Sequence, residues 1–216
     1  MDSRMRAVMN FVREGSRVAD VGADHGYLSI ALIESGRASK VIATEKNIHP
    51  LGAAIKNIDA AGLSGVIEAR LGDGLQVLTA GEVDTICIAG MGGALIAKIL
   101  DDAPEVVQSA RSLIFQPMNG VKKIRTWLAD NDWTIADEDL AESAGIIYEI
   151  ICAERNVTPK IFKRDSSPLL PKFTAQRIEK LQRVLSEMSK SPVARNSEKF
   201  AALQAEIDAL RRLIDE

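Results

Sequence analysis

Over the first two thirds of the chain, short hydrophobic runs alternate with segments whose hydrophobic residues recur every three or four positions. Continuous apolar runs of about four to eight residues are typical of buried strands, and the longer spacing is typical of amphipathic helices. The runs predict five strands, at 17–21, 40–44, 66–71, 83–89 and 112–115. The longer spacing predicts helices at 1–12, 26–35, 94–100 and 121–130, and another between Asn47, as its N-cap, and Gly62.

Two further strands are expected at 134–142 and 145–154. Their connection is short, so the two strands are expected to be antiparallel to each other. Five strands that alternate with helices, followed by such a hairpin, predict an α/β fold. Its sheet is mostly parallel, ends in an antiparallel hairpin and is covered by helices on both faces.

The hydrophobic pattern changes after Arg155. Residues 158–171 contain three prolines and are expected to form a linker. Two narrow hydrophobic seams follow at alternating steps of three and four, separated by a break at Ser191-Pro192: Ile178, Leu181, Leu185 and Met188, then Phe200, Leu203, Ile207, Leu210 and Ile214. Such seams are typical of coiled coils and predict an antiparallel helical hairpin. We therefore expect two domains, residues 1–154 and a linker with a helical extension at 155–216.

Charge is divided unevenly between these two parts. The net charge of −3 does not indicate a nucleic-acid-binding protein by itself. Residues 1–154 carry 14 Lys or Arg against 22 Asp or Glu, whereas residues 155–216 carry 13 against 8. The basic extension is able to meet phosphate groups. On charge alone, a solvated surface on long helices explains it equally well.

The overall composition is that of a globular protein without membrane segments. Hydrophobic residues make up 46% of the chain, which allows a substantial core. The sequence shows neither a charged-then-apolar leader nor an apolar run of about 18 residues, so a soluble, cytoplasmic protein is expected. Cys87 and Cys152 lie in strand-like runs and are expected to be buried and free. Cys and His have no metal-ligand spacing, so no metal is expected.

The stretch Val18 to Leu32, VADVGADHGYLSIAL, is expected to form a strand, a glycine turn and the start of a helix. Gly22 and Gly26 allow positive φ angles and close approach of a ligand to the backbone. Glu45 ends the second strand, 19 residues after Gly26, where an acid accepts hydrogen bonds from ribose hydroxyls. This arrangement predicts a nucleotide-like cofactor.

Two cofactors fit this arrangement, NAD and S-adenosylmethionine. The turn is not G-x-G-x-x-G, because Asp24 and His25 occupy it. Asp20 and Asp24 suit a cofactor that has an ammonium group, whereas carboxylates would repel a pyrophosphate. Asp73, in Gly72-Asp73-Gly74 after the third strand, adds a polar group for an adenine edge.

A second glycine cluster, Ala89-Gly90-Met91-Gly92-Gly93, follows the fourth strand. The carboxyl ends of strands line the ligand site in this class of fold. Three glycines in four residues expose backbone groups against which a planar base could lie. A tight turn explains one or two of these glycines, but less easily three.

Five motifs give the chain a resemblance to a known family. They are VADVGADHGYLSIAL, IAGMGGALI (88–96), LIFQP (113–117), IRTWLADNDWTI (124–135) and IIYEI (146–150). The chain resembles the TrmK family of bacterial tRNA adenine N1-methyltransferases, which act on the adenine at position 22. The family usually has Ala and Pro in place of Gly26 and Ser29, and its Q-P-N run is interrupted here by Met118 before Asn119.

The resemblance implies a Rossmann-like class I methyltransferase domain with a C-terminal coiled-coil extension. It also implies S-adenosyl-L-methionine as cofactor and tRNA as partner. From the sequence itself we expect no membrane, no metal, and a monomer or weak dimer. The expected cofactor-binding residues are Gly22, Asp24, Gly26, Glu45, Lys46, Asn47, Asp73, Gly74, Ala89, Gly90 and Met91.

Asp24 is the candidate for stabilising or deprotonating the methylated, cationic ring, with His25 and Tyr27 shaping the base pocket. The expected substrate-binding residues are Gly92, Gly93, Gln116, Pro117, Asn119, Lys122 and Arg125, with Arg177, Lys180 and Arg183 on one face of the extension. The alternatives are a methyltransferase acting on a small molecule or protein, an NAD-linked oxidoreductase, and a non-catalytic binding module.

Overall fold

The computed structural model describes residues 2–158 and 162–215. It divides into two compact units, Met1–Arg164 and Asp165–Glu216. Within the described residues, every helix is too short or too polar to cross a lipid bilayer.

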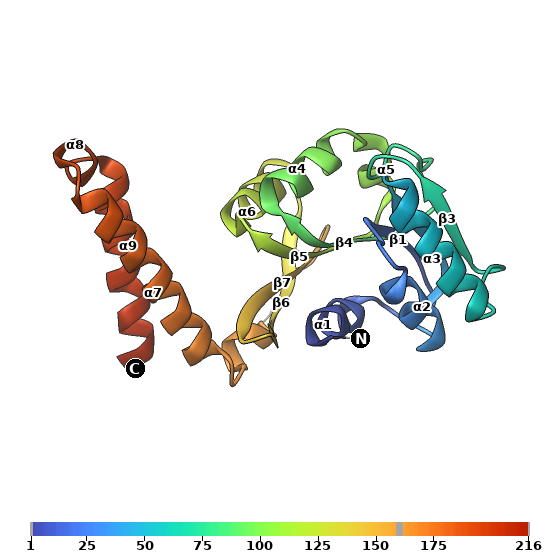
Figure 1. Cartoon of the computed structure of the whole chain (residues 1–216), viewed down its shortest axis with the longest axis horizontal. Helices are drawn as coiled ribbons and strands as arrows, with labels where there is room; N and C mark the ends of the chain where they lie inside the picture. Colours follow the sequence, from blue (N-terminus) through green and yellow to red (C-terminus); the bar gives the residue numbers. More distant parts are fainter. Residues whose placement is uncertain (1, 159–161, 216) are drawn as a thin grey trace. The chain divides into compact units, whose positions relative to one another are not determined.

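The first unit is built on a seven-stranded sheet with the order β3-β2-β1-β4-β5-β7-β6 (Figure 1). Its strands are β1 Ser16–Val21, β2 Ala38–Glu45, β3 Ile67–Leu71, β4 Thr85–Gly92, β5 Ser112–Asn119, β6 Thr134–Ser143 and β7 Ile146–Glu154. β1 to β5 are parallel, and β6 and β7 form an antiparallel hairpin at one edge. The sheet confirms the predicted α/β fold.

Helices cover both faces of the sheet, and each face has its own core. The helices are α1 Ser3–Phe11, α2 Tyr27–Glu34, α3 Ile48–Ala60, α4 Gly93–Asp101, α5 Pro104–Ser109 and α6 Val121–Asp130. α1, α2 and α3 pack on one face, against residues such as Val18 and Cys87, and α4, α5 and α6 pack on the other, against residues such as Ala19 and Ile88. The side chains of adjacent strand residues therefore pack into opposite cores, because successive side chains of a strand point to opposite faces of the sheet.

Two elements of this unit differ from the prediction. Residues 116–119, expected to lie in a loop, continue β5, because the end of β4 pairs with them: Met91 with Pro117 and Gly92 with Asn119. Helix α5 was not predicted; its single short turn of apolar residues, Val106 and Val107, is too brief to show a helical period.

The second unit is the expected helical hairpin. α7 Leu170–Ser189 and α9 Glu198–Asp215 pack along their seams, and the short α8 Pro192–Arg195 connects them. Leu181, Leu185 and Ile207 are buried between the two helices, and the predicted seam residues Ile178, Phe200, Leu203 and Leu210 pack against them. Met188 is half-buried, and the side chain of Ile214 lies outside the described residues. The predicted linker falls partly on residues 159–161, which also lie outside them; Lys163–Ser166 forms a 3₁₀ turn.

The boundary between the units lies ten residues later than the predicted one at 154/155. Arg164, the last residue of the first unit, forms an ion pair of 2.9 Å with the buried Glu138 of β6. The later boundary also changes the charge division. Four cations at 155–164 now belong to the first unit, and residues 165–216 carry nine Lys or Arg against eight Asp or Glu. The hairpin is therefore close to neutral.

Candidate functional site

A cavity of about 220 Å³ lies at the carboxyl ends of the central parallel strands. Nine of the predicted cofactor-binding residues line it, namely Gly22, Glu45, Lys46, Asn47, Asp73, Gly74, Ala89, Gly90 and Met91. The remaining lining residues are Val21, Thr44, Gly72, Leu95 and Ile99. Leu95 and Ile99 come from α4; apolar residues on a helix give no sign in the sequence that they face a ligand rather than the core. Strand ends far apart in the sequence thus converge on one cavity.

Glu45 presents a largely buried carboxylate to this cavity. Its Oε1 accepts hydrogen bonds from the Asn47 backbone N–H at 2.9 Å and from Asn47 Nδ2 at 3.1 Å. Its Oε2 accepts no hydrogen bond from a described residue. Asn47 occupies the N-cap position of α3, as predicted, but its side chain holds Glu45 instead of capping the helix. The geometry fixes one oxygen and leaves the other as an acceptor for ligand hydroxyl groups.

Glycine is required at two points in the cavity wall. Gly22 has a φ of +72°, and a Cβ there would overlap the terminal methyl group of Met91. Gly74 has a φ of +60°, and a Cβ there would lie 2.9 Å from Ile99 Cγ2. Both residues therefore combine a left-handed backbone with close packing, which a larger residue cannot do without strain.

Asp24, His25 and Tyr27 lie in the turn after β1 and at the start of α2, outside the lining residues of the cavity. The Asp24 and His25 side chains are 68% and 50% exposed, and Asp24 Oδ1 lies 3.7 Å from His25 Nε2. The rings of His25 and Tyr27 stack with centroids 5.7 Å apart. The structure brings the three together as an exposed polar and aromatic group beside Gly22.

Gly26 and Asp20 have other surroundings than expected. Gly26, with a φ of +75°, packs against Ala54 of α3 and does not line the cavity. Asp20 does not offer its carboxylate to a ligand ammonium group. It is buried, and its Oδ2 accepts a hydrogen bond of 2.6 Å from the Ser29 hydroxyl. Burial raises the pKa of Asp20 from 3.8 to about 6, although the Ser29 hydrogen bonds lower it.

We expect Asp20 to make stability depend on pH. With a pKa raised by folding, Asp20 contributes stability that is present below about pH 4 and lost as the pH rises through about 6. The Asp20→Asn variant has no such titration. Its free energy of unfolding, relative to the wild type, should therefore increase by roughly 2–3 kcal/mol between pH 4 and pH 7. Urea denaturation at each pH measures this difference, and a pH-independent difference would contradict the assignment.

The ends of β4 and β5 form a tight junction beside the cavity. A Cβ on Gly93 would overlap the Gly120 carbonyl oxygen, so Gly93 allows the two chains to approach. Gly92 is less confined, with its Cβ position 3.1 Å from Asn119 Oδ1. Asn119 is exposed, whereas Gln116 and Pro117 are buried in β5 and present no side-chain surface to a substrate in this structure.

Most of the basic residues expected to contact the substrate form ion pairs with carboxylates of the protein. One expected lysine in each unit is exposed instead. Arg125 forms ion pairs with the buried Glu138 and with Glu149 at 3.2 Å, whereas Lys122 is exposed at the start of α6. In the hairpin, Arg177 pairs with Glu206 at 2.7 Å and Arg183 with Glu179, and Lys180 is exposed.

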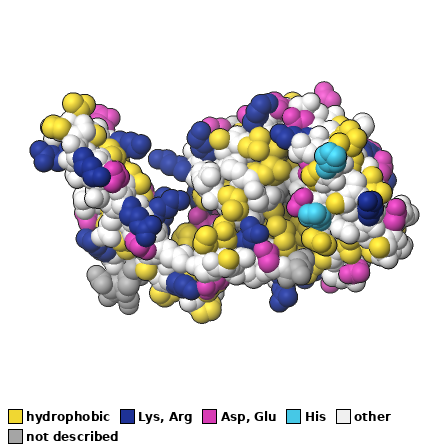
Figure 2. All heavy atoms as spheres, viewed as in Figure 1, with side chains coloured by type: hydrophobic (Ala, Val, Ile, Leu, Met, Phe, Trp, Pro, Cys, Tyr) yellow, Lys and Arg dark blue, Asp and Glu magenta, His cyan; other side chains and the backbone are white. Residues whose placement is uncertain are grey.

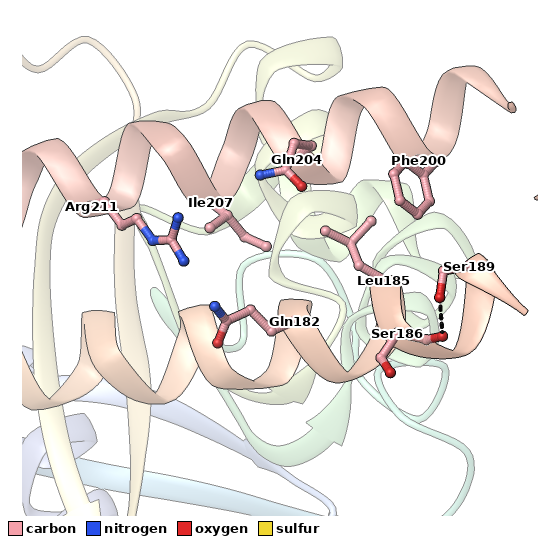
Figure 3. Close-up of a pocket in the computed structure, with 8 residues that line it drawn as sticks. All are labelled: Gln182, Leu185, Ser186, Ser189, Phe200, Gln204, Ile207 and Arg211. Carbon is pink, nitrogen blue, oxygen red and sulfur yellow. Dashed lines mark hydrogen bonds between the residues drawn. The ribbon is translucent and has the colours of Figure 1, made fainter. Parts of the chain in front are cut away.

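A larger hollow, of about 480 Å³, lies between α7 and α9 of the hairpin (Figure 3). Its lining residues are Gln182, Leu185, Ser186, Ser189, Phe200, Gln204, Ile207 and Arg211. They are mostly polar side chains on the edges of two packed helices, and they include no carboxylate. The cavity at the strand ends is smaller but combines an oriented carboxylate with exposed backbone. Among the described residues, no cluster of three or more His, Cys, Asp or Glu is arranged to hold a metal ion.

Comparison with known proteins gives a consistent result. A family model described as a methyltransferase domain matches residues 1–151. The tRNA (adenine(22)-N(1))-methyltransferase of Bacillus subtilis is 32% identical over 232 residues, which cover 100% of this chain and 97% of that protein. The crystal structure of the B. subtilis m1A22 tRNA methyltransferase TrmK superposes with a TM-score of 0.85 at 28% identity, covering 99% of this chain and 98% of that one. A Streptococcus pneumoniae protein crystallised with S-adenosyl-L-methionine gives 0.84 at 33% identity, covering 99% and 100%.

Proposed function

Because the chain belongs to the TrmK family of tRNA methyltransferases, we propose that it methylates ring N1 of the adenine at position 22 of tRNA. The methyl donor is S-adenosyl-L-methionine, with which the Streptococcus pneumoniae relative was crystallised. The observation that carries the proposal is the cavity in which Glu45 and the glycine-bounded strand ends converge. A tRNA substrate agrees with the cytoplasmic location expected from the sequence.

The residues of the cavity fit this cofactor. Glu45 Oε2 is an acceptor for ribose hydroxyl groups, and Asp73 lies at the end of β3 for a polar edge of adenine. Asp24 lies outside the cavity lining but is exposed two positions after Gly22, where a carboxylate can face an ammonium group. A pyrophosphate would be repelled by the same carboxylate, which argues against NAD.

The chemistry requires alignment more than base catalysis. When bound, S-adenosyl-L-methionine supplies an electrophilic methyl group on a sulfonium. Adenine N1 has an in-plane lone pair, so the protein mainly has to hold the ring in line with that methyl group. Methylation leaves the ring cationic, and we assign Asp24 to stabilising that charge. His25 and Tyr27, stacked beside Asp24, are assigned to the pocket for the base.

An apolar rim supports binding of an unstacked base. Four hydrophobic side chains near the carboxyl ends of strands are exposed: Tyr27, Ile48 and Leu95 in the helices that follow β1, β2 and β4, and Met118 near the end of β5. Leu95 also lines the cavity. Figure 2 shows a region rich in hydrophobic side chains on the face that also carries both histidines. Because N1 is hidden in a paired or stacked adenine, the target nucleotide has to leave its stack. Exposed apolar and aromatic surface is suited to receive it.

The proposal is tested by incubating the protein with labelled cofactor and unmodified total tRNA, followed by digestion and nucleoside analysis. We expect the label in 1-methyladenosine. Label in another nucleoside would refute N1 chemistry. Labelling of protein or of a small molecule, but not of tRNA, would support the alternative class of methyltransferase.

Replacement of Gly92 by Val should reduce methyl transfer by at least tenfold while cofactor affinity changes little. Gly92 has φ −75° and ψ 145°, which Val adopts readily, so the backbone should be preserved. The added side chain projects toward Asn119, where we expect the base to pass. Calorimetry with S-adenosylmethionine and single-turnover methylation separate the two effects. Normal transfer would show that Gly92 serves only the junction of β4 and α4.

The hairpin is proposed to contact tRNA through Arg177, Lys180 and Arg183. Two of these are in exposed ion pairs, which are worth little and can be exchanged for phosphate contacts. Replacing all three by Ala should weaken tRNA binding and reduce the log–log salt dependence by about two to three units. A control variant removes the same charge from Lys190, Arg195 and Lys199. Equal losses in both variants would show that the predicted face has no special role.

A further inference from the structure

The backbone at Gly90 departs from the regular pairing of β4 and β5. Ala89 pairs with Gln116 and Met91 pairs with Pro117, so Gly90 is an extra residue between them. Its φ is +75°. An extra residue of this kind is a β-bulge, which bends a strand and redirects its end. Here the bulge places the backbone of Gly90 and Met91 in the wall of the proposed cofactor cavity.

The side chain of Gln116 replaces the missing strand partner of Gly90. Gln116 Oε1 accepts a hydrogen bond of 3.3 Å from the Gly90 N–H, and Nε2 donates one of 3.1 Å to the Pro117 carbonyl. The side chain is completely buried. A buried amide of this kind is satisfied only in one orientation, so Gln116 fixes the bulge.

Arg4 supplies a second donor to the same amide oxygen. Arg4 Nη1 lies 3.5 Å from Gln116 Oε1. The rest of the guanidinium is held elsewhere: Nε and Nη2 donate to Asp2 Oδ2 at 2.9 and 2.8 Å, and its carbon lies 5.0 Å from the ring centroid of Tyr148. Asp2 is itself fixed as the N-cap of α1, accepting from the Met5 N–H. The position of Arg4 is therefore set by α1 and β7.

We propose that Arg4 is a positioning residue that acts through Gln116 to hold the Gly90 bulge in the shape the methyl-transfer site needs. Arg4 does not line the cavity, and its charge is paired with Asp2, so it does not act by binding the cofactor directly. Its planar guanidinium can bond Asp2 and Gln116 at the same time, and its charge strengthens the bond to the amide oxygen. The inference rests on the proposed function, because the Gly90 backbone belongs to the proposed cofactor site.

A double-mutant cycle tests the inference with two readouts. We would measure S-adenosylmethionine affinity by calorimetry, and single-turnover transfer to unmodified tRNA at saturating cofactor, in Arg4→Met, Gln116→Met and the double variant. Each single variant should slow transfer at least fivefold and weaken cofactor binding at least threefold. If Arg4 acts through Gln116, the double variant should match Gln116→Met within twofold, because coupled residues are not additive.

Two further variants distinguish positioning by Arg4 from a general effect of changing helix α1 or of removing a positive charge. Arg6→Met removes an exposed arginine from the same helix and should stay within twofold of the wild type. Arg4→Lys keeps the charge but cannot bond Asp2 and Gln116 together, so it should behave like Arg4→Met. It also serves as the test if Arg4→Met does not fold.

The inference is overturned if the effects of the two single variants on transfer and on cofactor affinity multiply in the double variant. It is also overturned if Arg4→Lys has wild-type values, or if Arg4→Met changes them as little as Arg6→Met does. Failure of the proposed function gives a different result. In that case the wild type would bind S-adenosylmethionine without methylating tRNA, and the affinity cycle alone would still decide whether Arg4 acts through Gln116.

Discussion

Replacing Glu45 by Ala is expected to weaken binding of S-adenosyl-L-methionine by roughly 1–3 kcal/mol, or about 5- to 150-fold. The Glu45 carboxylate is largely buried, with one oxygen bonded to Asn47 and the other available to ligand hydroxyl groups. Its removal leaves those hydroxyl groups without a partner in the cavity. Calorimetry with the purified protein measures the change directly.

Two controls separate the contact of Glu45 with the ligand from its hydrogen bonds with Asn47. Glu45→Gln keeps an oxygen for the Asn47 N–H but loses the acceptor on the ligand side, so its affinity should fall between those of the wild type and Glu45→Ala. Glu68→Ala removes an acid from the neighbouring strand that pairs with Arg70 outside the cavity, and it should leave affinity unchanged. An unchanged dissociation constant in Glu45→Ala would exclude the ribose contact.

Asp24→Asn is expected to lower turnover at saturating cofactor by more than tenfold. Asp24 has a φ of +51°, and Asn also adopts this left-handed conformation, so the substitution removes charge with little change of backbone. If the carboxylate stabilises the cationic methylated ring, its loss affects the transition state more than cofactor binding. The measurement is kcat at saturating cofactor together with the cofactor KM.

The matched control is Asp132→Asn, the same change at an exposed residue with a φ of +59° in the turn before β6. It should leave kcat and KM unchanged. If Asp24→Asn raises only the cofactor KM, Asp24 is a binding residue and its catalytic assignment fails.

The position of several candidate residues in the fold follows from local sequence, and their roles stay predictions. Glu45 ends β2, Gly22 directly follows β1, Gly72 and Gly74 follow β3, and Gly90 lies near the end of β4. The carboxyl ends of parallel strands meet at one edge, so a strand assignment is sufficient to place these residues together. Nine of the residues that the family resemblance implies for the cofactor line a single cavity at that edge.

The parts that depend on side-chain contacts between distant residues were not predicted. Asp20 looks like a ligand group in the sequence, but Ser29, in the first turn of α2, donates a hydrogen bond to its carboxylate. Gln116 looks like a substrate contact, but its side chain is buried and accepts a hydrogen bond from Arg4, 112 positions away. Arg164, placed in the linker by the sequence, forms an ion pair with the buried Glu138 of β6. Hydrophobic periodicity contains no information about which buried polar groups become partners.

The central claim, transfer to N1 of one adenine, is tested most directly with two tRNA transcripts that differ only at position 22. The protein, labelled S-adenosylmethionine and each transcript are incubated under identical conditions, and the nucleosides are analysed. We predict one methyl group per molecule, as 1-methyladenosine, in the transcript with adenine at position 22, and none in the transcript with guanine there. Equal labelling of the two transcripts would contradict the account.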